Sequence, residues 1–169
     1  MSHQVKFKDK MYNLAGPHLK AGDAAPDFAC VTGLDMVTLK DTGAKPRLFS
    51  VVPSLDTPVC SMQTKKFNEA VAGLGEKVAC YTVSLDMPFA QKRFCEAEGI
   101  KNIKNLSDLH NQSFGKHYGV LIEGLPIPLL SRAIFVVDKN NKITYVEYVP
   151  EVGAHPDYDK AVAALKAAV

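Results

Sequence analysis

The stretch "RLFSVVPSLDTPVCSMQTKKF", residues 47–67, decides the fold class and carries one cysteine in an unusual setting. Its first part, residues 47–53, is a short apolar run typical of a buried strand. Its second part begins a helix, because the apolar residues Phe67, Val71 and Leu74 recur at helical spacing. A strand that leads directly into a helix is the unit from which α/β proteins are built.

The predicted helix begins with an arrangement that favours a reactive thiol. Thr57 is a good N-cap residue, Pro58 suits the first helical position, and this register places Cys60 at the third. A thiolate there would face backbone N–H groups that have no helical partner, together with the positive end of the helix dipole. Because such sites activate thiols, Cys60 is a candidate nucleophile. The alternative is a plain capped helix in which Cys60 is a small buried residue.

The order of the predicted elements indicates an α/β sandwich with a parallel centre and one antiparallel hairpin. Because Cys60 follows a strand and opens a helix, it should lie at the carboxyl edge of the sheet, where functional groups of such folds gather. The predicted strands are a hairpin over residues 4–17, short strands in 26–33, 35–41, 47–53, 77–86 and 102–108, and a hairpin over 132–149. The predicted helices are residues 58–73, 87–99, 110–118 and 156–168.

Length and composition suit one compact domain over residues 1–169, since 47% of the residues are hydrophobic. A net charge of +2 is too mild to indicate a nucleic-acid partner. No apolar run approaches the roughly 18 residues of a membrane span, so we expect no membrane partner. The N-terminus lacks the apolar region of a signal peptide, so we expect a cytoplasmic location.

The four cysteines, at positions 30, 60, 80 and 95, follow neither a metal-binding nor a disulfide-reductase pattern. No pair has the C-x-x-C spacing, and the five histidines do not cluster with the cysteines, so we expect no metal site. Cys80 lies within the apolar run of residues 78–85 and is interpreted as a core residue. Cys30 is interpreted in the same way.

Pro53, Thr57 and Cys60 together resemble the P-x-x-x-T-x-x-C signature of the peroxiredoxins. The chain is similar, from about residue 4 to residue 168, to the bacterial thiol peroxidase branch, an atypical two-cysteine group of that family. The stretches that carry this similarity are residues 53–68, 84–100 and 129–138. Val52 and His110 depart from the branch, which commonly has an aromatic residue and an arginine at these positions.

The resemblance implies a thioredoxin-like fold with an N-terminal β-hairpin extension and a thiol-dependent peroxidase. Cys60 would be the peroxidatic nucleophile, and Cys95 the resolving cysteine that forms an intramolecular disulfide with it. Thr57 would hydrogen-bond the thiolate and the peroxide, Arg132 would stabilise the thiolate and the departing oxygen, and Pro53 would shield the sulfur from water. The substrates would be hydrogen peroxide and organic hydroperoxides, without a cofactor. The reductant would be thioredoxin, and the protein would be a homodimer.

Cys60 and Cys95 lie on different predicted helices, and we expect Cys95 on the face or first turns of its own helix. A disulfide requires Cα atoms within about 7 Å of each other. We expect that the two cysteines cannot come within this distance while both helices keep their ends intact. Oxidation should therefore unwind the first turn of the Cys60 helix and loosen the segment around Cys95, because helix termini are the easiest places to unwind.

Three other functions are alternatives to a peroxidase. A cysteine hydrolase would use Cys60 with His110 or His117 as its base. A disulfide reductase of the thioredoxin type would need a C-x-x-C motif, which this helix lacks. A non-catalytic sensor would be oxidised by peroxide once and signal to a partner. Single residues also have structural alternatives: a salt bridge for Arg132, a helix cap for Thr57 and packing for Cys95.

Overall fold

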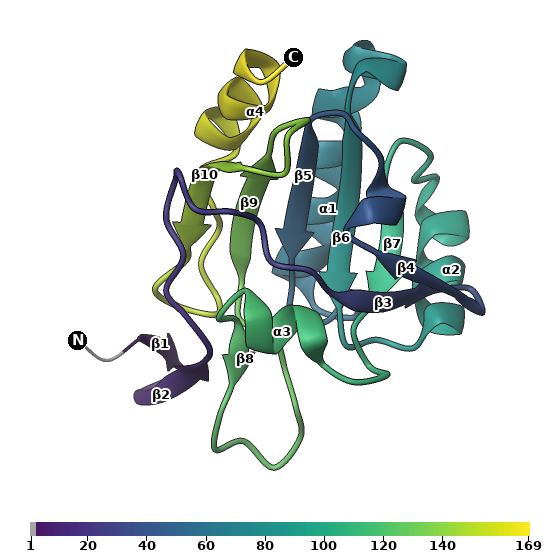
Figure 1. The fold of residues 1–169 in the computed structure, drawn as a ribbon. Coiled ribbons are helices and arrows are strands. Elements are labelled where there is room, and N and C mark those ends of the chain that lie inside the picture. Colours follow the sequence, from purple (N-terminus) through teal and green to yellow (C-terminus); the bar gives the residue numbers. More distant parts are fainter. Residues whose placement is uncertain (1–2) are drawn as a thin grey trace.

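The computed structural model describes residues 3–169 and arranges them as two sheets flanked by helices (Figure 1). The larger sheet has seven strands in the order β10-β9-β5-β6-β7-β3-β4, and the smaller has three in the order β1-β2-β8. The strands are β1 Gln4–Phe7, β2 Lys10–Ala15, β3 Ala29–Thr32, β4 Asp35–Thr38, β5 Arg47–Val51, β6 Ala79–Ser84, β7 Lys104–Ser107, β8 Leu121–Ile122, β9 Ala133–Val137 and β10 Ile143–Tyr148.

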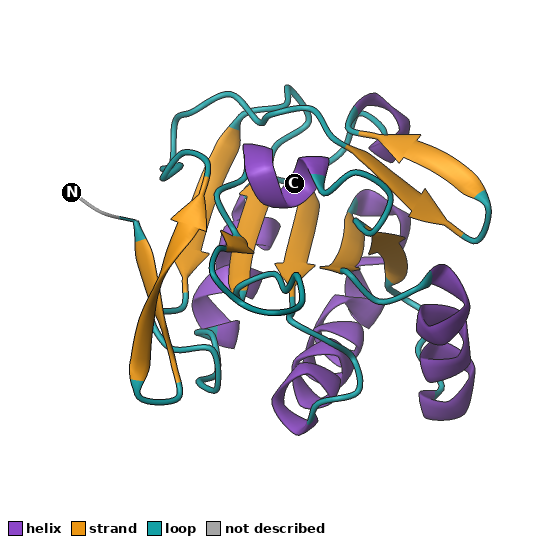
Figure 2. Ribbon diagram, turned by 90° about the horizontal axis from the view of Figure 1, so that it is seen from below, coloured by secondary structure: helices purple, strands orange, loops and turns teal. Residues whose placement is uncertain are grey.

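Helices cover the larger sheet on both faces. The α-helices are α1 Pro58–Val71, α2 Pro88–Glu98, α3 Ser113–His117 and α4 Tyr158–Ala167, and the short 3-10 helices are η1 Lys40–Thr42 and η2 Ala72–Lys77. Figure 2 shows the three longer helices on one side of the sheet and the short α3 on the other. Both α1 and α2 begin with a proline, which fits the first helical position because the missing N–H has no helical partner there.

The centre of the larger sheet is parallel, as the apolar runs predicted. Strand β5 pairs in parallel with β6, with Leu48 opposite Cys80, and every residue of β5 is buried. Alternate side chains point to opposite faces of the sheet. Leu48 joins the core beneath the long helices with Phe67 of α1, whereas Phe49 joins the core on the other face with Phe114 of α3.

The β3–β4 hairpin is a second antiparallel hairpin in the larger sheet, where the sequence predicted one. Strands β9 and β10 pair as predicted, but β3 also pairs antiparallel with β4 and, at Val31, with β7. The two strands themselves were predicted, and Gly33 in the turn between them has a φ of +60°. The antiparallel direction of β3 relative to β7 depends on the pairing of Val31 with Ser107. These residues are far apart in the sequence, so the local sequence pattern does not predict their pairing.

The predicted N-terminal hairpin is formed by β1 and β2, and it is extended by a strand that the sequence did not predict. Leu14 of β2 pairs with Ile122 of the two-residue strand β8. The side chains of Val5, Leu14, Ile122 and Val152 form a small core of their own. Because Val152 follows β10, this core joins the hairpin to the chain segment next to Arg132.

Helix α2 is capped at Met87, and Asp86 before it has a different role. The Asp86 carboxylate instead accepts hydrogen bonds from the Ser54 hydroxyl at 2.8 Å and the Leu55 N–H at 2.8 Å. These bonds tie the end of β6 to the loop between β5 and α1. The carboxylate therefore fixes the segment that leads into Cys60.

Candidate active site

Cys60 lies at the carboxyl edge of the sheet, in the first turn of α1. Strand β5 ends at Val51 and α1 begins at Pro58, so Cys60 is the third helical residue, as predicted. Thr57 has the extended backbone of an N-cap residue, with φ −109° and ψ 149°. Its carbonyl accepts the Ser61 N–H at 3.0 Å, which closes the first helical turn around a fully buried Cys60.

The resemblance implied that the Thr57 hydroxyl hydrogen-bonds the thiolate and the peroxide, but in this structure the hydroxyl is bonded to the loop before the helix. It donates to the Ser54 carbonyl at 2.8 Å and makes no capping bond to the helix. The physical reason is the tight turn over residues 54–57, in which the Thr57 N–H also donates to the Ser54 carbonyl, at 3.2 Å. A contact between this hydroxyl and a thiolate or peroxide stays a prediction.

Arg132 is the residue that contacts the Cys60 sulfur. It is buried immediately before β9, and its Nη1 donates to Cys60 Sγ at 3.3 Å and to Gln63 Oε1 at 3.0 Å. Its Nε and Nη2 both donate to the Val152 carbonyl, at 3.1 and 2.8 Å. Four hydrogen bonds thus fix the plane of the guanidinium with one edge toward the sulfur.

The charge of Arg132 is not neutralised by a carboxylate. Within residues 3–169, no acidic side chain lies within ion-pair distance of it, so the salt-bridge alternative is wrong. A buried charge is costly unless it is paired. Arg132 contacts a carbonyl, an amide oxygen and the Cys60 sulfur. Of these groups, the Cys60 thiol can ionise and so supply the negative charge that pairs with the guanidinium.

Gln63 is a site residue that sequence reasoning missed. It is fully buried one turn after Cys60, and its Nε2 donates to the Ser50 hydroxyl of β5 at 2.7 Å. Because its Oε1 accepts from Arg132, the amide links the sheet to the guanidinium. One feature of the sequence could have indicated it: Gln63 is an uncharged polar residue three positions after Cys60, so the two side chains share a helix face.

An apolar shell closes around the sulfur. Cys60 packs with Val52 and Leu55, and Phe94 of α2 packs against this cluster. Pro53, which lies between Val52 and Leu55 in the sequence, is also buried, and this burial fits its expected role of shielding the sulfur from water. Such a shell excludes water and so strengthens the interaction between Arg132 and a thiolate.

Cys95 lies apart from this cluster, in the last turn of α2, so the expectation of a place in the first turns is wrong. Its sulfur is half-buried, accepts a hydrogen bond from Asn105 Nδ2 at 2.9 Å and packs with the core that contains Phe67. Burial raises the pKa of the Cys95 thiol, and the Asn105 hydrogen bond offsets part of this increase. Phe94 packs against both the Cys95 core and the Cys60 cluster, so it connects the two groups of residues.

The other two cysteines belong to the core, as predicted. Cys30 and Cys80 are buried on opposite faces of the larger sheet. Burial raises the pKa of Cys80 to about 12. The pKa of Cys30 is raised further, by burial and by the nearby carboxylate of Asp108. Both thiols are therefore protonated at neutral pH and unsuited to nucleophilic attack.

Within residues 3–169, neither of the two histidines considered as a base makes a hydrogen bond to Cys60. His117 is exposed and its Nδ1 is bonded to the Asp27 carbonyl at 2.7 Å, and His110 is exposed in the turn before α3. No group of three His, Cys, Asp or Glu residues in this range could hold a metal ion. None of the helices described is long and apolar enough to cross a membrane.

The sequence and the structure match one family of proteins over almost the whole chain. The profile of the redoxin family matches residues 20–162. A thiol peroxidase from Halalkalibacterium halodurans is 52% identical over 98% of this chain and 98% of its own. A thiol peroxidase from Bacillus subtilis is 46% identical with the same coverage of both chains. The chain belongs to the thiol peroxidases of the peroxiredoxin family.

Solved structures agree with this assignment. A peroxiredoxin-like protein from Aquifex aeolicus is 43% identical, covers 100% of this chain and 99% of its own, and superposes with a TM-score of 0.92. A thiol peroxidase from Chromobacterium violaceum, 24% identical with a TM-score of 0.87, supports the fold alone. The expected thioredoxin-like fold with an N-terminal β-hairpin is confirmed. As a thiol peroxidase, the protein is an enzyme that reduces peroxides, which favours this activity over hydrolase, reductase or sensor.

Proposed function

We propose that this peroxiredoxin reduces hydrogen peroxide and organic hydroperoxides through a Cys60 sulfenic acid and a Cys60–Cys95 disulfide that thioredoxin reduces. The observation that carries the proposal is the 3.3 Å contact between Arg132 Nη1 and Cys60 Sγ in a buried, apolar setting. A cation without a carboxylate partner stabilises a thiolate most strongly where water is excluded.

The first step moves negative charge from sulfur across two oxygens. The Cys60 thiolate attacks one peroxide oxygen, an S–O bond forms and the O–O bond breaks, so sulfur is oxidised and the peroxide is reduced. The departing hydroxide or alkoxide takes up a proton and leaves as water or an alcohol. Fixed N–H donors along this path need no reorganisation during the reaction, and the two bonds from Arg132 to the Val152 carbonyl provide that fixity. Thr57 would contribute its hydroxyl on peroxide binding, after release from Ser54.

The second step joins the two cysteines. The Cys95 thiolate attacks the sulfenic sulfur of Cys60, an S–S bond forms, the S–O bond breaks, and hydroxide leaves as water after taking up a proton. Cys60 lies in the first turn of α1 and Cys95 in the last turn of α2, and Phe94 packs against both groups. Because terminal turns are the cheapest parts of a helix to unwind, both thiols can reach each other without loss of the sheet.

The end of α2 is suited to such opening. Gly99 ends the helix in the left-handed conformation, with φ +66°, and the Ile100 N–H donates to the Cys95 carbonyl at 2.9 Å. This terminal motif ties Cys95 to its helix through a few backbone bonds. We propose that these bonds break in the disulfide form and expose Cys95 to thioredoxin.

The homodimer is a further part of the proposal. Met62 in α1, Met87 before α2 and Phe89 in α2 are about half exposed or more, at 47%, 53% and 60%. Both helices begin at the carboxyl ends of neighbouring parallel strands, so these apolar side chains belong to the same edge of the molecule. Neighbouring exposed apolar residues favour a contact with a second copy of the chain. We also propose a single domain and a cytoplasmic location.

The experiment measures steady peroxide turnover with thioredoxin, thioredoxin reductase and NADPH. The wild type should turn over continuously, and Cys60→Ser should lose all activity, because no other described thiol contacts a cation. Cys80→Ala is the matched control and should remain active. Activity above a trace in Cys60→Ser contradicts the nucleophile assignment, and a single turnover by the wild type would instead support the sensor.

Non-reducing peptide mapping after one equivalent of peroxide tests the second step. The main product should be Cys60 joined to Cys95, with Cys30 and Cys80 free. An intermolecular disulfide as the main product, or a bond from Cys60 to another cysteine, would contradict the role of Cys95 while leaving Cys60 as the nucleophile.

A further inference from the structure

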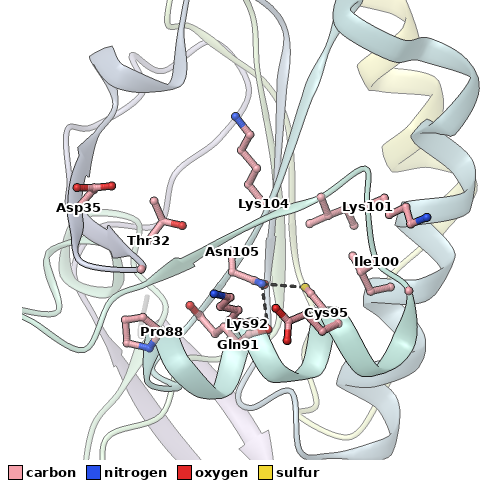
Figure 3. Close-up of a pocket in the computed structure, with 14 residues that line it drawn as sticks. Thr32, Asp35, Pro88, Gln91, Lys92, Cys95, Ile100, Lys101, Lys104 and Asn105 are labelled. Atoms are coloured by element: carbon pink, nitrogen blue, oxygen red, sulfur yellow. Dashed lines mark hydrogen bonds between the residues drawn. The ribbon is translucent and has the colours of Figure 1, made fainter.

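A pocket of about 580 Å³ lies beside Cys95 (Figure 3). None of the residues that line it belongs to the cluster around Cys60. The pocket is bounded by α2, by the chain that follows α2, by β7 and by the β3–β4 turn. Cys95 and Asn105 both line it, and the close-up shows the Asn105 amide directed at the sulfur. The reduced Cys95 thus rests against β7.

The Asn105 side chain makes two donor contacts and has no acceptor contact. Its Nδ2 donates to Cys95 Sγ at 2.9 Å and to the Gln91 carbonyl at 3.3 Å. A backbone carbonyl can only accept, so Gln91 fixes which end of the amide faces the sulfur. Within residues 3–169, the buried Asn105 Oδ1 has no hydrogen-bond partner. The amide is therefore held in place by its N–H groups, one of which is committed to the thiol.

An N–H donor acts on the two protonation states of a thiol unequally. It stabilises the thiolate more than the neutral thiol, because the bond to an anion is stronger. Burial raises the pKa of Cys95, and the bond from Asn105 lowers it. Because the pKa of Cys95 stays above its ordinary value even with this bond, loss of the donor would lower the thiolate fraction at neutral pH further.

Charged groups also surround the pocket, but they are exposed. Exposed charges act weakly through water, whereas Asn105 is in direct contact with the sulfur. The charged groups that line the pocket are Lys92 and Glu96 of α2, Lys101 after it, Lys104 of β7 and Asp35 of β4. Helix α2 also carries Arg93 and Glu98, and Glu98 pairs with Lys65 of α1 at 2.8 Å.

We propose that Asn105 is a positioning residue for the resolving step, which holds Cys95 against β7 and donates a hydrogen bond to the thiolate that attacks the oxidised Cys60. The proposal rests on the proposed function, in which Cys95 is the resolving cysteine. The thiolate leaves Asn105 as the S–S bond forms and hydroxide departs from the sulfenic sulfur. Asn105 therefore stabilises the state that precedes the attack.

The test is the pH dependence of Cys95 alkylation by iodoacetamide, followed by mass spectrometry in the Cys60→Ser background. Asn105→Asp keeps the shape of the side chain but replaces the donor with an anion, and Asn105→Ala removes the group. We expect the alkylation midpoint to rise by about one pH unit in Asn105→Ala and by more in Asn105→Asp. Asn102→Asp is the control, since it adds the same charge at an exposed position before β7.

With Cys60 present, the formation of the disulfide at neutral pH should slow by about tenfold in Asn105→Ala, since one pH unit is tenfold in thiolate. Unchanged alkylation midpoints in both Asn105 variants, or an equal shift in Asn102→Asp, overturn the inference. Failure of the wild type to form a Cys60–Cys95 disulfide overturns the proposed function instead. A normal wild-type disulfide with unchanged midpoints overturns the role of Asn105 alone.

Discussion

Replacement of Arg132 by lysine keeps the positive charge but removes the planar group that holds it in place. The guanidinium makes four hydrogen bonds, two to the Val152 carbonyl, one to Gln63 and one to Cys60. A lysine has one nitrogen at the end of a flexible chain, and it cannot reach Val152, Gln63 and the sulfur in the same geometry. We expect both the reaction rate and the stability to fall.

The size of each loss follows from the contacts. Loss of one fixed donor to a developing anion lowers rates by about 10²-fold, on the order of 3 kcal/mol. The Val152 carbonyl and the Gln63 side chain are buried, and each buried acceptor left without a partner costs about 1–3 kcal/mol. If lysine satisfies one of them, the free energy of unfolding should fall by about 1–3 kcal/mol.

Arg47 provides a matched control at the opposite end of β5. It is also fully buried, and it donates to the Thr42 hydroxyl, the Asp138 carbonyl and Asn141 Oδ1 at 2.9, 2.6 and 2.7 Å. Arg47→Lys should therefore destabilise the protein by a similar amount, but it should leave the rate near that of the wild type. The comparison separates loss of stability from loss of transition-state stabilisation.

The assay is the second-order rate of Cys60 oxidation by peroxide, measured by rapid quench with alkylation and mass spectrometry. This readout suits a chain that contains no tryptophan to report the reaction by fluorescence. Unfolding by denaturant gives the stability of each variant. A wild-type rate in Arg132→Lys would refute the argument, as would an equal rate loss in Arg47→Lys.

Three further predictions follow from buried polar groups. Gln63→Leu should slow Cys60 oxidation by about tenfold, because Arg132 loses its link to the sheet; the same rapid-quench assay measures this, and an unchanged rate would contradict it. Cys80→Ala should keep full turnover and disulfide formation, because burial raises the Cys80 pKa to about 12; peptide mapping of the oxidised variant checks this. Burial also raises the pKa of Asp108, so the folded protein holds this proton more tightly than the unfolded chain. The difference in unfolding free energy between the wild type and Asp108→Asn should therefore shift against the wild type as the pH rises above 3.8, the ordinary pKa of an aspartate. Denaturant titrations at several pH values measure this difference, and a difference that does not change with pH would contradict the prediction.

The sequence predicted the parts of the site that short-range rules control. The capped start of α1 follows from Thr57 and Pro58, and it places Cys60 in the first turn without any tertiary information. The contact with Arg132 joins residues 72 positions apart, and only the family resemblance indicated it. Gln63 was missed because its role depends on that distant contact.

Tertiary pairing also explains the errors in the fold. The two-residue strand β8 exists because Leu14 and Ile122 pair across the molecule, and two residues carry no periodicity that a pattern could detect. The hydroxyl of Thr57 donates to the Ser54 carbonyl within a local turn, and its contact with a thiolate or peroxide stays a prediction.

The hydrogen bonds of Arg132 show how the site can open and re-form. Unwinding of the first turn of α1, residues 58–61, breaks the bond to Cys60 but none of the other three. Gln63 lies in the next turn and is bonded to Ser50, and the Val152 carbonyl lies in the segment between β10 and α4. In the proposed disulfide step, the guanidinium would therefore keep its position while Cys60 moves to meet Cys95. After reduction of the proposed disulfide, the thiolate would return to a guanidinium that is already in position, so refolding of the turn would restore the site without rearrangement of the core.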